Sequence, residues 1–312
     1  MKQRVKHLVT VADLKNDEIR QVYEIAAHTK QQIRSGSRST ALAGRVLGMI
    51  FEKPSMRTRM SFQSAMIQAG GQAMDIRGQE IGLGKRESVK DVACVMSRYV
   101  DAIMIRTFAH KNVQLLARHA TVPVINGLSD DAHPCQALAD VFTVREKLGT
   151  VRGARLVFVG DGNNVARSLA VLCAKLGMRF TLSAPHGHEF DARFLRRLAK
   201  LAGGKAAARL VRDPHRAVKN ADILYTDVWA SMGQEGEAAA RATLFRPYQV
   251  NRTLLRSAPR AALVMHCLPA HRGDEITDAV MDGARCIAYD QAENRLHVQK
   301  GLLIHLLGAG DV

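Results

Sequence analysis

The chain has 312 residues, of which 47% are hydrophobic, and carries a formal net charge of +16. This length allows two domains of ordinary size, and the lack of any run of about 18 apolar residues excludes an ordinary membrane-spanning helix. Five cysteines without a C-x-x-C pair argue against disulfides and a thiolate zinc site, and the charged N-terminal segment lacks the apolar stretch of a secretory signal, so we expect a cytoplasmic protein.

The basic residues are spread along the chain. The densest stretch, residues 191–212, has Phe194, Leu195, Leu198 and Leu201 near helical spacing, which predicts a helix with a solvated basic face. Aromatic residues make up only 5% of the chain and no nucleic-acid motif is legible. A basic nucleic-acid-binding protein is therefore the weaker alternative to an enzyme that acts on anionic substrates.

Short apolar runs alternate with helix-like segments along the whole chain. Eight strands are predicted in two groups of four, at residues 46–51, 72–76, 101–106 and 122–126, and at residues 154–160, 179–184, 222–228 and 261–268. Helices fall between them, for example over 61–71 and 163–177. The alternation predicts two α/β domains, each a doubly wound parallel sheet, which we place at residues 1–130 and 131–291.

Ligands of parallel sheets bind beyond the carboxyl ends of the strands. In this sequence nearly every predicted strand runs into a loop of polar, titratable or small residues. Two such edges that face each other would form a cleft, so we expect the active site between the two domains.

The first of these loops lies in "FEKPSMRTRM", residues 51–60. Pro54 ends the strand and a periodic helix follows at once, so Ser55 to Thr58 should lie at a helix N-terminus, which favours an anion. Arg57 and Arg59 are two positions apart, roughly 200° around a helix. One should therefore bind and the other brace the structure; the alternative is a well-capped helix with solvated arginines.

In "DAHPCQALADVF", residues 131–142, Pro134 suits a first helical turn and places His133 at the helix N-terminus. That position disfavours the protonated imidazole, and a neutral imidazole could donate to a carbonyl oxygen, with the Gln136 amide nearby. The alternative is a structural histidine.

The stretch "VFVGDGNNVARSL", residues 157–169, partly matches a dinucleotide fingerprint. Gly160 and Gly162 fit, but Val165 stands at the third glycine and the next strand ends without the acid that would hold a ribose. A nucleotide-dependent oxidoreductase is therefore disfavoured, and Asn163 and Asn164 suit a polar substrate better.

Two later strands end in reactive side chains. Asp227 follows one strand and could hold a substrate ammonium group, with Trp229, Ser231 and Met232 after it. Cys267 ends another, next to His266. Adjacent strand residues point to opposite faces, so His266 is a poor base for Cys267; the alternative for Cys267 is a buried small hydrophobe.

Four motifs in this order, "FEKPSMRTR", "HPCQ", "DVWASMGQE" and "HCLP", closely resemble the aspartate/ornithine carbamoyltransferase family, and the last two resemble its ornithine branch. The likeness extends to "SRYVDAIMIRTF" and "AENRLHVQKGLL", and so covers essentially the whole chain. It implies an anabolic-type enzyme that transfers the carbamoyl group of carbamoyl phosphate to the δ-amine of L-ornithine, without a metal or organic cofactor. Sister enzymes acting on putrescine or an acylated ornithine are the alternatives.

The resemblance also implies how the domains are used. Residues 1–130 would bind carbamoyl phosphate, residues 131–291 would bind ornithine, and a C-terminal helix at about 292–312 would pack back on the first domain. The family is trimeric, with sites at subunit contacts, so a homotrimer or a multiple of trimers is expected.

Site residues follow by position from the same resemblance. Those for carbamoyl phosphate are Ser55, Met56, Arg57, Thr58, Arg106, His133, Gln136, Cys267, Leu268 and Arg295. Those for ornithine are Asn164, Asp227, Ser231 and Met232. The catalytic roles fall to Arg57, Arg106, His133 and Cys267.

Two positions depart from the family pattern. Met56 stands where Thr is common, and Gly82 stands where many relatives carry Gln or His that reaches a neighbouring subunit. We expect one of the two cations that follow, Lys85 rather than Arg86, to take over that contact; the alternative is that the loop only covers the site and Lys85 is solvated.

Overall fold

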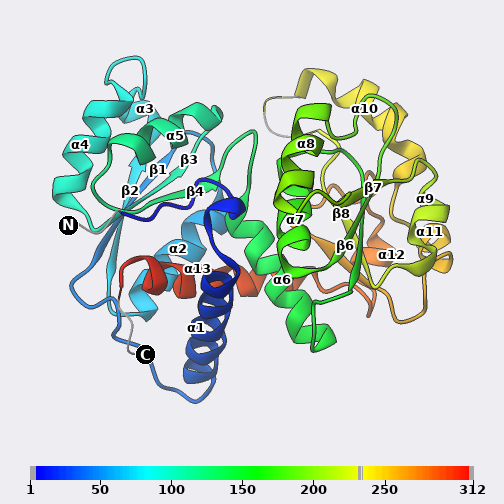
Figure 1. Cartoon of the computed structure of the whole chain (residues 1–312), viewed down its shortest axis with the longest axis horizontal. Helices are drawn as coiled ribbons and strands as arrows, with labels where there is room; N and C mark the ends of the chain where they lie inside the picture. The colour runs from blue at the N-terminus through cyan, green and yellow to red at the C-terminus, as the bar shows by residue number, and fades with distance from the viewer. Residues whose placement is uncertain (1–4, 231–232, 234, 309–312) are drawn as a thin grey trace. The chain divides into compact units, whose positions relative to one another are not determined.

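The computed structural model describes residues 5–230, 233 and 235–308. The chain forms two compact units, one of Met1–Phe142 with Glu293–Val312 and one of Thr143–Ala292. Each unit contains a parallel sheet with helices packed on it (Figure 1). The prediction of two parallel-sheet α/β domains is therefore confirmed. Within the described ranges, no helix combines the length and the apolar character needed to cross a membrane.

The first unit is built on a sheet of strand order β2-β1-β3-β4 in its described residues. Its strands are β1 (Val46–Phe51), β2 (Gln72–Arg77), β3 (Ala102–Arg106) and β4 (Val124–Leu128). Its helices are α1 (Asn16–Arg34), α2 (Met56–Gln68), α3 (Gly78–Ile81), α4 (Val89–Tyr99) and α5 (His110–His119), with a 3-10 turn at Val11–Asp13.

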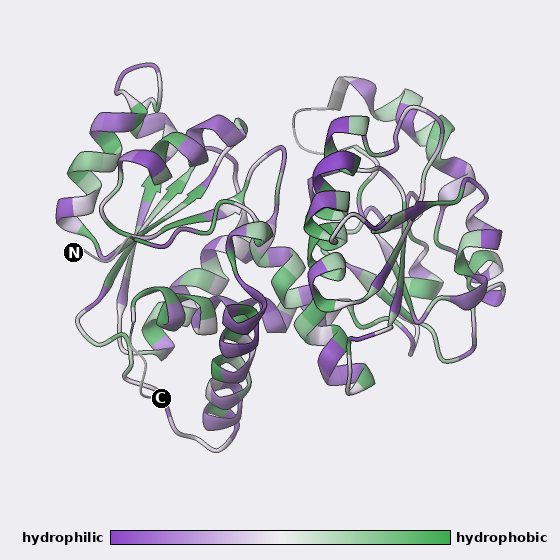
Figure 2. Ribbon diagram, in the orientation of Figure 1, coloured by the Kyte–Doolittle hydropathy of each residue, from purple (hydrophilic) through white to green (hydrophobic). Residues whose placement is uncertain are grey.

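Alternation along β1 and β3 separates two buried faces. Ile50, Ile103 and Ile105 pack against apolar residues of α4 and α5, so the neighbouring Met49 and Met104 point to the opposite face. The strands are accordingly mostly green in Figure 2, while purple residues lie on the outer sides of the helices. Burial on both faces is why β1 and β3 read as nearly continuous apolar runs in the sequence.

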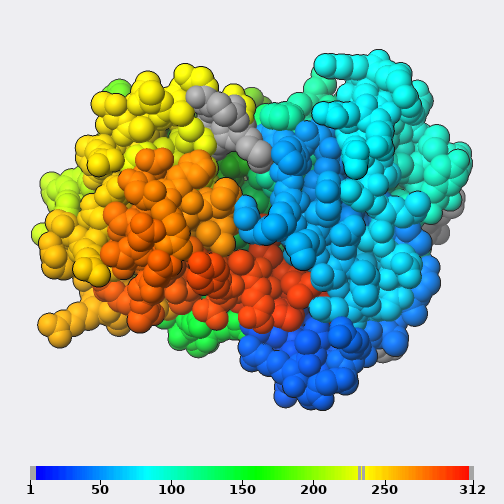
Figure 3. All heavy atoms as spheres, turned by 180° about the vertical axis from the view of Figure 1, so that it is seen from behind, coloured from blue at the N-terminus to red at the C-terminus, as the bar shows by residue number. Residues whose placement is uncertain are grey.

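The C-terminal helix α13 (Ala288–Leu306) packs on α1. In Figure 3 its red atoms lie against the dark blue atoms of α1. A Cβ at Gly301 would meet the Val22 carbonyl oxygen at 2.5 Å, so this approach requires glycine. Lys30 Nζ donates to Asn294 Oδ1 at 2.7 Å across the same contact.

Lys300 of α13 is buried and its Nζ donates to Gln68 Oε1 at 2.7 Å. Burial, with a smaller contribution from the charge of Arg38, lowers the pKa of Lys300 to about 8. Between this value and the unfolded value of about 10.4 the unfolded chain binds more protons, so the stability contributed by Lys300 rises with pH across that window and is lost below it.

We therefore compare the free energy of unfolding of wild type with that of Lys300→Met. From pH 8 to pH 10.5 the difference should change by about 2 kcal/mol in favour of wild type. This is less than the pKa shift alone would give, because solvent screens part of the effect. Urea unfolding at both pH values measures this. Lys111→Met, at an exposed position on α5, is the control and should show a constant difference. An equally constant difference for Lys300→Met would contradict the prediction.

The second unit has strand order β7-β6-β5-β8-β9 over its described residues. Its strands are β5 (Arg155–Val159), β6 (Arg179–Ser183), β7 (Ala208–Leu210), β8 (Ile223–Thr226) and β9 (Leu263–His266). Its helices are α7 (Asn164–Leu176), α8 (Ala192–Leu201), α9 (Pro214–Ala217), α10 (Ala238–Phe245), α11 (Arg252–Arg256) and α12 (Asp278–Met281), with 3-10 turns at Val218–Asn220, Glu235–Glu237 and Arg246–Tyr248.

One core of this unit joins Val157, Leu224 and Val264 of three strands to Trp229 and Phe245. On the other face Phe158 and Tyr225 stack with ring centroids 5.2 Å apart.

The basic stretch 191–212 was predicted to form a helix with a solvated basic face, and helix α8 confirms the helix over Ala192–Leu201, whereas the strand that follows it was not predicted. Helix α8 ends at Leu201 and the stretch then forms the short strand β7. Phe194 and Leu198, four positions apart, are buried, whereas Leu195 and Leu201 are exposed. This edge strand has three residues, is partly exposed and contains Arg209. It therefore has no apolar run from which it could be predicted.

The predicted domain boundary, between residues 130 and 131, lies in the loop before α6 (Pro134–Leu148). The compact units divide inside this helix, after Phe142, and again inside α13, after Ala292. Two helices therefore pass from one unit into the other.

Candidate active site

The corner between β1 and α2 carries the first predicted anion site. Helix α2 begins at Met56, and the hydroxyl of its N-cap Ser55 accepts a hydrogen bond from the Thr58 backbone N–H at 3.2 Å. Residues 55–58 thus lie at a helix N-terminus, where backbone N–H groups and the helix dipole favour an anion. A serine cap is also common at helices that bind no ligand, so the surrounding side chains are needed to identify an anion site.

Arg59 has the bracing role. Its Nε lies 3.2 Å from Asp75 Oδ2 of β2, and its guanidinium lies 4.8 Å from the ring centre of Phe51 at the end of β1. It therefore ties α2 to two strands. Arg57 lies elsewhere on the helix, and its charge acts on His133.

Lys53, the third cation of this motif, is buried and holds neighbouring loops together. Its Nζ lies 2.7 Å from Asp130 Oδ1 and 4.1 Å from the ring centre of Phe108. These contacts join the segments that follow β1, β3 and β4, so Lys53 stabilises the edge of the sheet that carries the polar loops.

Two buried arginines converge on one hydroxyl in the first unit. Arg106, at the end of β3, is 7% exposed and Arg295, on α13, is 3% exposed. Thr58 Oγ1 accepts from Arg106 Nη1 at 3.4 Å and from Arg295 Nη2 at 3.0 Å. Arg295 Nη1 also donates to Gln136 Oε1 at 2.7 Å. Guanidinium groups gathered in this way next to a helix N-terminus suit a phosphate dianion.

His133 is buried directly before α6. Burial first, and then the charges of Arg295, Arg106 and Arg57, hold the pKa of its imidazole well below the usual value. The imidazole is therefore neutral near pH 7 and can donate one N–H to a carbonyl oxygen. The neutral form was predicted from the helix N-terminus, and burial and three arginines are further causes in the structure.

The second unit has a buried carboxylate at the matching edge of its sheet. Asp227, directly after β8, is 7% exposed. Its Oδ2 accepts from Asn163 Nδ2 at 2.9 Å, and its Oδ1 accepts from the Cys267 thiol at 2.9 Å and from the Val228 backbone N–H at 2.8 Å. Segments that follow β5, β8 and β9 thus meet at one acid, and such a group can hold an ammonium ion.

Asn163 was noted in the sequence with Asn164 as suited to a polar substrate, but only Asn164 was assigned to the ornithine site. Asn163 is the N-cap of α7, and its Oδ1 accepts from the Val165 and Ala166 N–H groups while its Nδ2 reaches Asp227. Asn164 is the first residue of the helix. The preference for asparagine at helix N-caps is the sequence signal that could have identified Asn163 as the cap and Asn164 as the first helical residue.

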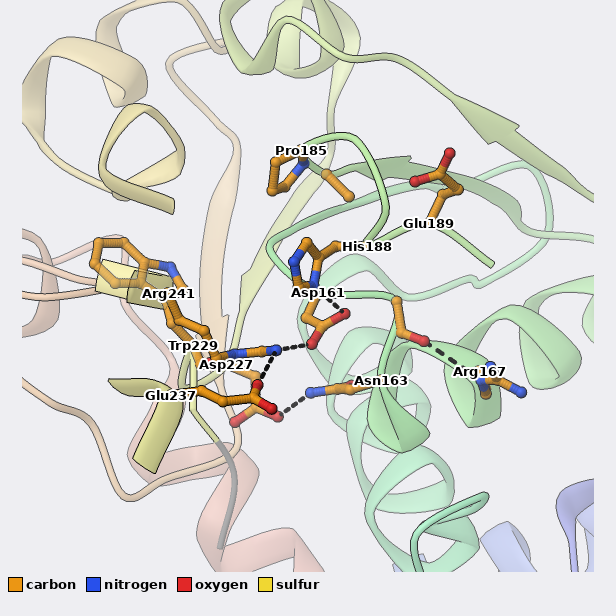
Figure 4. Close-up of polar contacts among 12 residues, drawn as sticks. Asp161, Asn163, Arg167, Pro185, His188, Glu189, Asp227, Trp229, Glu237 and Arg241 are labelled. Atoms are coloured by element: carbon orange, nitrogen blue, oxygen red, sulfur yellow. Dashed lines mark hydrogen bonds and ion pairs between the residues drawn. The ribbon is translucent and has the colours of Figure 1, made fainter. Parts of the chain in front are cut away.

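Arg241 is a residue that the sequence did not reveal. Its guanidinium is buried, forms an ion pair with Asp161 and donates to the Trp229 carbonyl oxygen at 2.5 Å. Asp161 also lies 3.6 Å from His188 Nδ1, and Glu237 lies 3.4 Å from Arg241 (Figure 4). Arg241 thus joins the loops that follow β5 and β8, and its partner Asp161 also contacts the loop that follows β6.

The predicted site residues Ser231 and Met232 lie outside the described residues.

The turn after β9 contains Cys267 and Leu268. Leu268 has φ of 58°, the one positive φ among the described residues other than glycine. The Cys267 sulfur contacts Asp227, whereas the fully buried His266 imidazole contacts Glu275. The two side chains diverge as strand alternation predicts, and His266 is not placed to act on the thiol.

Comparison with known proteins covers both units. The family model "Aspartate/ornithine carbamoyltransferase, carbamoyl-P binding domain" matches residues 6–146, and the model "Aspartate/ornithine carbamoyltransferase, Asp/Orn binding domain" matches residues 152–306. The chain belongs to the aspartate/ornithine carbamoyltransferase family. The resemblance drawn from the four motifs is thus confirmed.

Relatives of this carbamoyltransferase align along its whole length. It is 52% identical to the ornithine carbamoyltransferase of Methanopyrus kandleri over 97% of each chain, and 51% identical to that of Syntrophus aciditrophicus over 96% of this chain and 98% of the relative. The solved ornithine carbamoyltransferase of Pyrococcus furiosus superposes with a TM-score of 0.94 at 47% identity and full coverage of both chains.

The glycines of the weak dinucleotide fingerprint serve packing in this carbamoyltransferase. A Cβ at Gly162 would lie 3.0 Å from the His188 carbonyl oxygen, so glycine lets the loop after β6 approach. Glu189, the acid nearest the end of β6 in sequence, pairs with Arg212 at 2.6 Å instead of being available to a ribose. The oxidoreductase alternative finds no support.

Gly82, where the sequence predicts a departure from the family pattern, lies in a turn that favours glycine. It ends α3 with φ of 61°, and an added Cβ would lie 2.8 Å from the Arg86 Cβ. The Gly82 carbonyl oxygen accepts from the backbone N–H groups of Lys85 and Arg86, both at 2.8 Å. A larger side chain here would be strained. The predicted role of Lys85 at a subunit contact stays a prediction.

Proposed function

We propose that this protein is an anabolic-type ornithine carbamoyltransferase, which transfers the carbamoyl group of carbamoyl phosphate to the δ-amine of L-ornithine and releases L-citrulline and phosphate. The observation that carries the proposal is a pair of complementary charged centres. The first unit buries Arg106 and Arg295 around Thr58, and the second buries Asp227 beside Cys267. The first suits a phosphate and the second suits an amino acid with a free ammonium group.

The chemistry follows from these charges. The deprotonated δ-amine attacks the carbamoyl carbon and the carbonyl oxygen gains negative charge. The C–O bond to phosphate then breaks, the carbonyl re-forms, and the proton lost by the amine nitrogen passes to the departing phosphate. Donors already in position stabilise this oxygen, and Arg106, Thr58 and neutral His133 are such donors. Arg57 and the N-terminus of α2 stabilise the departing phosphate. No covalent intermediate is needed.

The remaining assignments are part of the same proposal. Ser55, Met56, Gln136, Arg295, Cys267 and Leu268 complete the surround of carbamoyl phosphate. Asn164, Asp227, Ser231 and Met232 hold the amino-acid end of ornithine, which brings the amine into line for attack.

A colorimetric citrulline assay tests the function. Purified protein with carbamoyl phosphate and ornithine should form citrulline, and putrescine, N-acetylornithine or aspartate in place of ornithine should give little product. Preference for putrescine or the acylated substrate would indicate a sister enzyme instead. Tight, salt-sensitive DNA binding without citrulline formation would favour the nucleic-acid alternative.

Cys267 is expected to position the amine rather than form a covalent bond, since its thiol already donates to Asp227 at 2.9 Å. Cys267→Ser should raise the KM for ornithine about 10-fold and retain measurable turnover, because a hydroxyl can also donate but reaches less far. Cys286→Ser, at a half-buried cysteine in the same unit, is the matched control and should behave as wild type. A carbamoyl-thioester trapped on Cys267 during turnover would show the assignment to be wrong.

We further propose a cytoplasmic homotrimer. Met60 and Ile67 on α2 and Met74 on the edge strand β2 are 58%, 65% and 57% exposed, and α2 contacts β2. An apolar surface on an open sheet edge fits a second copy of the chain. Light scattering should give three times the chain mass of 34.2 kDa, or a multiple of that; a monomer would contradict the assembly.

A further inference from the structure

A fully buried polar pair lies directly behind the Cys267–Leu268 turn. His266 and Glu275 are both 0% exposed, and His266 Nε2 lies 3.0 Å from Glu275 Oε1. Neither residue has a part in the reaction proposed above. Burial of two such polar groups costs free energy, so the hydrogen bonds that they make must offset part of that cost.

The contacts determine which imidazole nitrogen carries the proton. The Leu268 backbone N–H donates to His266 Nδ1 at 2.9 Å, so Nδ1 is an acceptor and bears no hydrogen. The single proton of the neutral ring is therefore on Nε2, which donates to Glu275. Glu275 Oε1 also accepts from the His271 backbone N–H at 2.6 Å, so the carboxylate itself is held in place.

The turn has a conformation that needs such support. Leu268 has a left-handed backbone, with φ of 58°, which crowds the Cβ of any residue other than glycine. The bond from its own N–H to His266 compensates for that crowding. The strand end before it is anchored as well, because the His266 backbone N–H donates to Gln291 Oε1 at 3.0 Å, and Gln291 Nε2 donates to the Tyr225 hydroxyl at 3.0 Å.

We propose that His266 and Glu275 are positioning residues for carbamoyl transfer. Glu275 holds His266 as the Nε2–H tautomer, so that Nδ1 fixes the Leu268 backbone and keeps the Cys267 thiol against Asp227. This inference rests on the proposed function, because it assigns the turn to the place where the substrate amine is held.

Two substitutions of His266 distinguish a positioning role from simple packing in the core. The Asn side-chain oxygen can take the place of Nδ1, whereas the Gln amide nitrogen can take the place of Nε2. His266→Asn therefore keeps the bond to Leu268 and loses that to Glu275, and His266→Gln does the reverse. We expect kcat/KM for ornithine to fall about 10- to 100-fold in His266→Gln and less than about 5-fold in His266→Asn.

Substitution of the carboxylate gives an independent comparison. Glu275→Gln keeps an acceptor oxygen for His266 and should stay within about 5-fold of wild type, whereas Glu275→Leu should resemble His266→Gln. The circular dichroism spectrum and cooperative thermal unfolding should be retained in all four variants, which reports that the second unit is folded. Binding of inorganic phosphate, assigned above to the first unit, should also be unchanged.

A second readout needs no turnover. Alkylation of Cys267 by iodoacetamide, followed by peptide mass spectrometry, should be several-fold faster in His266→Gln than in wild type or His266→Asn, because a released thiol is more accessible. If wild type makes no citrulline, the proposed function fails, and the alkylation rates still decide the positioning role. Equal rates in the Asn and Gln variants, or a more impaired Asn variant, would overturn the inference.

Discussion

Replacement of Arg57 by alanine is expected to lower kcat/KM for carbamoyl phosphate by about 30-fold or more, because a charge-assisted hydrogen bond to a buried phosphate is lost. Arg57 lies on the first turn of α2, next to the N–H groups that face the anion, and its charge acts on His133. It is half-buried and not part of the core, so the fold should survive the change.

Arg59→Ala is the matched control, two residues away on the same helix. Arg59 contacts Asp75 and Phe51, so its loss should lower the melting temperature and leave the KM for carbamoyl phosphate nearly unchanged. Steady-state kinetics and thermal unfolding of both variants give the comparison. An Arg57→Ala enzyme with wild-type affinity for carbamoyl phosphate would remove Arg57 from the site.

The second large effect is expected at Asp227. Asp227→Asn should raise the KM for ornithine about 100-fold, because an ammonium group loses its buried counter-charge. The KM for carbamoyl phosphate should change little, since its phosphate contacts are assigned to the first unit. The amide has the size of the carboxylate, and its oxygen can still accept from Asn163 or from the Cys267 thiol, so local geometry is kept.

Strand β8 provides the control for this variant at its other end. Asp222, directly before β8, accepts from Arg155 Nη2 at 2.7 Å and from Arg155 Nε at 3.0 Å. Asp222→Asn should therefore lower stability without changing the KM for ornithine. If both substitutions raise that KM equally, the effect is structural and the assignment of Asp227 to the ammonium group is wrong.

Most of the fold could be predicted because its signals are local. Strands buried on both faces read as apolar runs, and the helices between parallel strands repeat with helical spacing. Together these patterns predicted eight of the nine strands among the described residues, including the exposed edge strand β2. Strand β7 was not predicted, because a short edge strand is partly solvated and has no such pattern. The position of the polar loops at one edge of each sheet was also predicted, since the carboxyl ends of parallel strands share one edge.

Which side chains meet within those loops depended on three-dimensional packing. The sequence of the first motif required that Arg57 and Arg59 diverge, but only the position of Asp75 on β2 shows which one braces. In the same way Arg295, far along the chain, reaches Thr58 only because α13 packs on the first unit. Contacts between residues distant in sequence produce no spacing pattern in the sequence, so they could not be predicted from it.

Thus sequence alone determined the fold class, the strand-end loops and the family, because each depends on short-range pattern or on contiguous motifs. Tertiary structure alone decided that Asn163 contacts Asp227, that buried Arg241 joins the loops after β5 and β8, and that His266 carries its proton on Nε2. The physical reason is the same in each case. A buried polar group must find its partners in space, and neither those partners nor its protonation is encoded by its neighbours in the chain.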